Sequence, residues 1–131
     1  MCAFTIVQDE TYFLEIWIKY YSRFLCNKDI YILDHNTCKP EAVDLLKRYK
    51  AEGYNVVTVN NMFSFNHYWL KSVVEDFQRF LLRSYKVVLF AESDEILIPR
   101  PDLYKQSLKE YSLNKISEFS SLSTSKGTLR C

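Results

Sequence analysis

The run Val87-Val88-Leu89-Phe90-Ala91, followed at once by Glu92-Ser93-Asp94-Glu95, decides the fold class. Its first five residues are apolar without alternation, which is typical of a strand that is buried on both faces of a sheet. Three other runs have the same character: Ala3–Val7, Ile30–Leu33 and Val56–Val59. We therefore predict four buried strands.

Helical patterns separate these runs. Apolar residues repeat at intervals of three and four over Thr11–Leu25. Pro40 is placed to begin the next helix and Gly53 to end it. A third apolar stripe precedes the last run, and Ser64 or Asn66 would cap its helix. With right-handed crossovers, the order β-α-β-α-β-α-β predicts an α/β fold, an open and mostly parallel sheet with helices on both faces.

Composition excludes several classes of protein. The 131 residues fit one domain, and a net charge of +1 gives no attraction toward nucleic acid, so we expect no nucleic-acid partner. No apolar run approaches the ~20 residues that span a bilayer, so we expect no transmembrane segment. The N-terminal residues lack the basic start of a secretory signal, and the cysteines lack CxxC spacing. We therefore expect a cytoplasmic protein with reduced thiols.

The two glycines, Gly53 and Gly127, also carry information. They lie too far apart for a glycine-rich phosphate loop, which excludes the standard Rossmann NAD motif and the P-loop.

Acidic side chains follow three of the four predicted strands, namely Asp9 and Glu10, then Asp34, then Glu92 and Asp94. The carboxyl ends of parallel strands meet at one edge, where open α/β sheets bind ligands. Oxygen ligands suit Mg²⁺ or Mn²⁺. On an extended segment, Glu92 and Asp94 would point to the same side. The alternative that these are only exposed, polar strand ends stays open.

Three segments resemble motifs of family 2-like glycosyltransferases. DETYFLEIWIKYY (residues 9–21) resembles their opening NE-x-x-x-L-x-E-W-I motif, although Asp9 stands where the family usually has Asn. DIYILDHNT (residues 29–37) resembles their second strand, which ends in an Asp and a short polar turn. VVLFAESDEILIP (residues 87–99) resembles their D-x-D-E-F signature. The three matches occur in order across residues 3–101.

The resemblance implies a GT-A fold, a nucleotide-sugar donor, a Mn²⁺ or Mg²⁺ ion, and a glycan or another hydroxyl as acceptor. Glu92 and Asp94 would be the metal-binding pair, with Glu92 in place of the first Asp. Asp34 would contact the nucleotide, and Asp9 and Glu10 would line the donor pocket.

The chain after the signature is short for this family. We predict a truncated GT-A domain, its donor-binding half, at residues 1–113, with a short helix at about Asp102–Tyr111. A Ser/Thr-rich tail follows at residues 114–131. The acids beyond the signature match no motif, so no general base is assigned. An exposed sheet edge makes a homo-oligomer plausible.

Two other functions stay open at this point. The chain could be a non-catalytic remnant of a glycosyltransferase that acts as a binding module. It could also be a Mg²⁺-dependent phosphotransfer domain, although such a domain wants an Asp after its third strand, where this chain has Asn60-Asn61.

The histidines and tryptophans are interpreted structurally. We predict that His35 is a turn residue and His67 a surface group at a helix start. Trp17 and Trp69 lie on helical stripes and are predicted to pack in the core.

Overall fold

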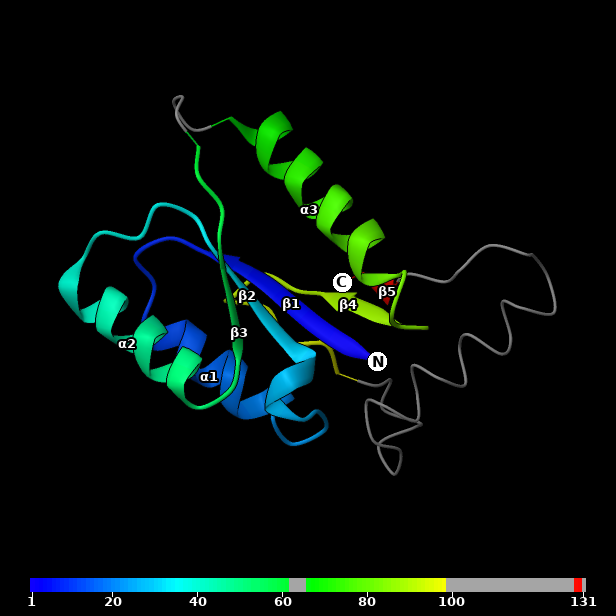
Figure 1. The fold of residues 1–131 in the computed structure, drawn as a ribbon, viewed down its shortest axis with the longest axis horizontal. Coiled ribbons are helices and arrows are strands. Elements are labelled where there is room, and N and C mark those ends of the chain that lie inside the picture. Colours follow the sequence, from blue (N-terminus) through cyan, green and yellow to red (C-terminus); the bar gives the residue numbers. More distant parts are fainter. Residues whose placement is uncertain (62–65, 99–128, 131) are drawn as a thin grey trace, which may run out of the picture.

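The structure, a computed structural model, describes residues 1–61, 66–98 and 129–130. Within residues 1–61 and 66–98, four strands lie at Cys2–Val7 (β1), Ile30–Asp34 (β2), Asn55–Thr58 (β3) and Val88–Phe90 (β4). Leu129–Arg130 (β5) extends the sheet beside β4. The strand order is β3-β2-β1-β4-β5, and every described pair is parallel (Figure 1). The predicted α/β fold with its parallel sheet is confirmed.

Three helices connect the first four strands, at Tyr12–Tyr21 (α1), Pro40–Ala51 (α2) and His67–Leu81 (α3), and a 3-10 turn at Asn27–Asp29 (η1) precedes β2. Helices α1 and α2 lie on one face of the sheet and α3 on the other (Figure 1). Both faces are therefore covered, as predicted.

The sequence signals for the helix ends are largely confirmed. Pro40 begins α2, and Gly53 follows it with a φ of +95°. The side chain of Asn66 caps α3 by accepting a hydrogen bond from the backbone N–H of Tyr68 at 2.8 Å. The first helix is shorter than predicted and ends at Tyr21, because the next residues form turns in which Phe24 and Leu25 donate back to the carbonyl of Tyr21.

The core forms on both faces of the sheet. On the α1 and α2 side, Trp17, Tyr21 and Ile32 are fully buried, which confirms the prediction for Trp17. On the α3 side, Phe4 and Leu33 pack with Val74 and Leu81. Each such side chain contributes about 1.5–3 kcal/mol through burial.

One strand departs from the prediction of full burial. Val57 and Thr58 of β3 are exposed. The reason is that β3 lies at the edge of the sheet, where β2 is its neighbour among the described strands.

Two predictions fall outside the part of the chain that the structure describes. These are the helix at about residues 102–111 and, apart from β5, the Ser/Thr-rich tail at 114–131. Within the described ranges, none of the helices has the length and apolar character needed to cross a membrane.

Candidate functional site

The order in which the chain adds strands to the sheet reverses between β1 and β4. The chain moves from β1 outward to β2 and β3, and then returns to place β4 on the other side of β1. In open α/β sheets, ligands bind at such a switch point, outside the carboxyl ends of the strands. The topology therefore points to the region that follows Val7 and Phe90.

A cavity of about 460 Å³ lies at this switch point. Its walls come from the end of β1, the starts of α1 and α3, and the segment after β4. The lining residues are Ile6, Gln8, Glu10, Phe13, His67, Leu70, Glu92, Ser93 and Asp94. A second cavity of about 240 Å³ shares His67 and Glu92 with it and adds Lys71. Glu10, Glu92 and Asp94 thus meet at one cavity, and neither Asp9 nor Asp34 is among its described lining residues.

The Glu92-x-Asp94 pair is presented by a turn. The backbone N–H of Glu95 donates to the carbonyl of Glu92 at 2.9 Å, which closes the turn. Our expectation of an extended segment is therefore wrong. Glu92 and Asp94 both line the cavity because the turn places them there, and not because they alternate along a strand. Both are exposed, and neither carboxylate has a hydrogen bond or ion pair with another residue in the described ranges. Their oxygens are therefore open to a ligand.

Asp9 has partners of a different kind. Its Oδ1 accepts hydrogen bonds from the backbone N–H groups of Cys38 at 2.7 Å and Lys39 at 2.8 Å. These bonds, led by that from Lys39, lower the pKa of the Asp9 carboxyl. The φ of Asp9 is +54°, a conformation that Asp tolerates better than most residues. Asp9 therefore joins the loop after β1 to the loop that begins α2.

Asp34 and Glu10 each hold a backbone amide of their own loop. Oδ1 of Asp34 accepts from the N–H of Thr37 at 3.1 Å. Oε1 of Glu10 accepts from the N–H of Phe13 at 2.9 Å. This bond supplies the cap of α1 that the side chain of Thr11 does not make. Three of the five predicted acids thus shape the loops around the site.

Helix α3 brings basic side chains to these cavities, since His67 lines both of them and Lys71 lines the smaller one. His67 is the first residue of α3, and Lys71 lies one turn further along. His67 is exposed, as predicted, but the sequence interpretation did not place it in the cavity. The spacing of four residues at the start of a helix after β3 is the signal that could have found the pair.

His35 is more than a turn residue. It is 5% exposed, and its ring lies 5.0 Å from that of Trp69 on α3. Trp69 is half-buried and belongs to neither core cluster of the described residues, so the prediction that it packs in the core is wrong, and its ring contacts His35 instead. This tilted ring contact joins the end of β2 to the first turn of α3.

Carboxylate oxygens such as those of Glu92 and Asp94 are the ligand type that a hard divalent ion takes. Among the described residues, no group of three or more His, Cys, Asp or Glu side chains could hold a metal. By themselves, Glu92 and Asp94 offer two carboxylate ligands at this turn, and a bound ion would need further oxygens from a ligand or from water. Mg²⁺ is commonly bound in this way, through one or two carboxylates together with substrate phosphates.

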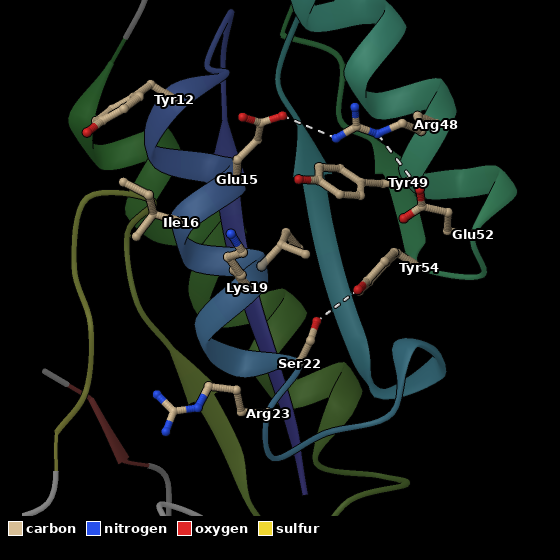
Figure 2. Close-up of a pocket in the computed structure, with 11 residues that line it drawn as sticks. Tyr12, Glu15, Ile16, Lys19, Ser22, Arg23, Arg48, Tyr49, Glu52 and Tyr54 are labelled. Atoms are coloured by element: carbon tan, nitrogen blue, oxygen red, sulfur yellow. Dashed lines mark hydrogen bonds and ion pairs between the residues drawn. The ribbon is translucent and has the colours of Figure 1, made fainter.

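A larger cavity, of about 580 Å³, lies between α1 and α2 (Figure 2). Arg48 spans it, with contacts of 3.1 Å to Glu15 and 3.8 Å to Glu52. The hydroxyls of Ser22 and Tyr54 are 2.8 Å apart. Much of its polar lining is thus paired within the groove, which lies between two helices and away from the switch point. We therefore place the candidate site at the smaller cavity.

Comparison of the chain with protein-family models, curated proteins and solved structures found no match.

Proposed function

We propose that this chain binds a nucleotide-sugar together with Mn²⁺ or Mg²⁺, as the donor-binding unit of a family 2-like glycosyltransferase. The observation that carries the proposal is the pair Glu92 and Asp94. Their carboxylates have no partner among the described residues, and both line a cavity at the switch point of the sheet. The three motif resemblances support the same function.

The donor would lie across the carboxyl end of β1. Its diphosphate would share the ion with Glu92 and Asp94, while its nucleoside would extend toward Asp34 at the end of β2. Lys71, which lines the adjoining smaller cavity, would add positive charge beside the phosphates. The bound ion would neutralise charge on the departing nucleoside diphosphate. The acceptor would be a glycan or another hydroxyl compound.

The phosphotransfer alternative receives less support. Flavodoxin-like receiver domains have the strand order 2-1-3-4-5, whereas the order here is β3-β2-β1-β4-β5. The residues after β3 are Asn60 and Asn61, which offer no carboxylate to phosphorylate.

Calorimetric titration tests donor binding. UDP- and GDP-sugars are titrated into the protein with Mn²⁺ and again with EDTA. We expect binding of one donor with Mn²⁺, and at least a tenfold loss in Asp94→Asn, since a carboxylate ligand becomes a neutral amide. Asp44→Asn, an exposed change on α2, is the matched control and should bind as the wild type does. Equal binding by Asp94→Asn would remove Asp94 from the metal site, and a wild type that binds neither donor would refute the function.

Release of the nucleoside diphosphate separates an enzyme from a binding module. The protein is incubated with the donor that binds, with and without Mn²⁺, and free UDP or GDP is measured. Mn²⁺-dependent release supports a transferase active site. Binding without release assigns the chain to the binding-module alternative.

A further inference from the structure

Both backbone polar groups of Leu97 are held by neighbouring tyrosines of α1. The hydroxyl of Tyr20 donates to the carbonyl of Leu97 at 2.6 Å. The N–H of Leu97 donates to the hydroxyl of Tyr21 at 3.1 Å. The Tyr21 side chain is fully buried, and the two rings stand edge to face with centroids 5.0 Å apart. Leu97 is thus fixed to α1 although 76 positions separate it from Tyr21.

This contact fixes the chain just after the turn of residues 92–95, which carries Glu92 and Asp94. At the near end, Ala91 is buried and its N–H donates to the carbonyl of Phe4 on β1 at 3.4 Å. Between these anchors, residues 92–96 include the turn closed by Glu95 and Glu92. The turn is therefore tied to the sheet on one side and to α1 on the other.

The same helix shapes the other wall of the cavity. Phe13, at the start of α1, lines the cavity and donates its N–H to the carboxylate of Glu10. Helix α1 thus lines the cavity with Phe13 in its first turn. In its last turn, Tyr20 and Tyr21 hold Leu97, which follows the turn with Glu92 and Asp94.

We propose that Tyr20 and Tyr21 are positioning residues for Glu92 and Asp94. Their hydroxyls hold Leu97 so that the turn presents both carboxylates to the cavity before an ion arrives. Removal of a group that supports metal ligands without contacting the metal typically lowers metal affinity by about 10–100-fold. This inference rests on the proposed metal site.

The test removes single hydroxyl groups and keeps the rings. The variants are Tyr20→Phe, Tyr21→Phe and the double variant, with Tyr12→Phe as a control on the same helix, because Tyr12 is 68% exposed. Two quantities are measured, the exchange rate of the Leu97 amide hydrogen and the affinity for Mn²⁺ by electron paramagnetic resonance. Circular dichroism verifies that each variant is folded.

We expect faster exchange of the Leu97 amide in Tyr21→Phe and Mn²⁺ binding weakened on the order of tenfold in the double variant. Tyr12→Phe should change neither quantity. Faster exchange with unchanged Mn²⁺ affinity would overturn the positioning role, since the tyrosines would then be structural only. Unchanged exchange would overturn the anchor itself. A wild type that binds no Mn²⁺ would overturn the positioning role whatever the exchange rates show, whereas the proposed function is refuted only if the wild type also binds neither donor with Mn²⁺.

Discussion

Asp9 and Lys39 are 30 positions apart in the chain, yet Oδ1 of Asp9 accepts a hydrogen bond from the backbone N–H of Lys39 at 2.8 Å. Cys38 donates to the same oxygen. A single carboxylate thus joins the loop after β1 to the start of α2. We expected Asp9 to line the donor pocket. Its hydrogen bonds to two backbone N–H groups give it a structural role that needs no ligand.

Replacement of Asp9 should therefore affect stability. We expect Asp9→Ala to lower the melting temperature by a few degrees, because two backbone N–H groups lose their acceptor and a left-handed φ becomes less favourable. Asp9→Asn should keep most of the stability, since its amide oxygen can still accept. Equal melting temperatures of Asp9→Ala and the wild type would contradict this role.

The contribution of Asp9 should also depend on pH. Hydrogen bonds from Lys39 and Cys38 lower the pKa of its carboxyl from the ordinary value of 3.8. A lowered folded-state pKa stabilises the fold above the unfolded value and loses that effect as the pH falls through the folded value. The difference in melting temperature between the wild type and Asp9→Asn should therefore shift against the wild type below about pH 4. A difference that stays constant from pH 7 to pH 3 would refute this.

Two substitutions of Glu92, one that keeps its negative charge and one that removes it, test whether its carboxylate is a metal ligand. Glu92→Asp restores the D-x-D pattern, so Mn²⁺ affinity should stay within about tenfold of the wild type, whereas Glu92→Gln should lose about 10–100-fold. Mn²⁺ titration followed by electron paramagnetic resonance measures both. If Glu92→Gln binds Mn²⁺ as well as Glu92→Asp does, the carboxylate is not a ligand.

The cysteines should differ in reactivity. Burial raises the pKa of the Cys2 thiol to about 12, whereas Cys26 and Cys38 are exposed. In a Cys131→Ser background, a thiol reagent at pH 8 should therefore modify Cys26 and Cys38 quickly and Cys2 only after unfolding, because the thiolate is the reactive form. Peptide mapping of the modified sites measures this. Rapid labelling of Cys2 in the folded protein would show that the β1 end of the core is open.

Tyr85 should stabilise the amino edge of the sheet. Its hydroxyl donates to Oδ1 of Asp29 at 2.9 Å and lies 3.2 Å from the hydroxyl of Tyr31. We expect Tyr85→Phe to lower the free energy of unfolding by about 1 kcal/mol in urea denaturation.

A control and a pH series complete this test. Tyr68→Phe, an exposed change on α3, should have no such effect. Burial and these partners raise the pKa of Tyr85, so its contribution should fade as the pH rises above about 10. An equal effect of both substitutions would contradict the role of Tyr85.

The sequence by itself determined the layers and most of the element boundaries. An uninterrupted apolar run such as Val87–Ala91 is typical of a strand buried on both faces, and Pro40 and Gly53 have backbone preferences that place the ends of α2. The same logic placed Glu92 and Asp94 at the carboxyl edge. It could not identify β3 as an edge strand, because strand order is set by how whole βα units pack and not by local composition.

Only the tertiary structure decided what each polar group at that edge does. It turned Asp9 and Asp34 to backbone amides, left Glu92 and Asp94 without described partners, placed His67 on the wall of the cavity, and joined Leu97 to α1. Hydropathy and turn preferences act between neighbours in sequence, whereas these pairings depend on which distant loops meet when the helices pack on the sheet. Asp9 and Asp94 are the same residue type in the sequence, yet one orders a loop and the other has no described partner.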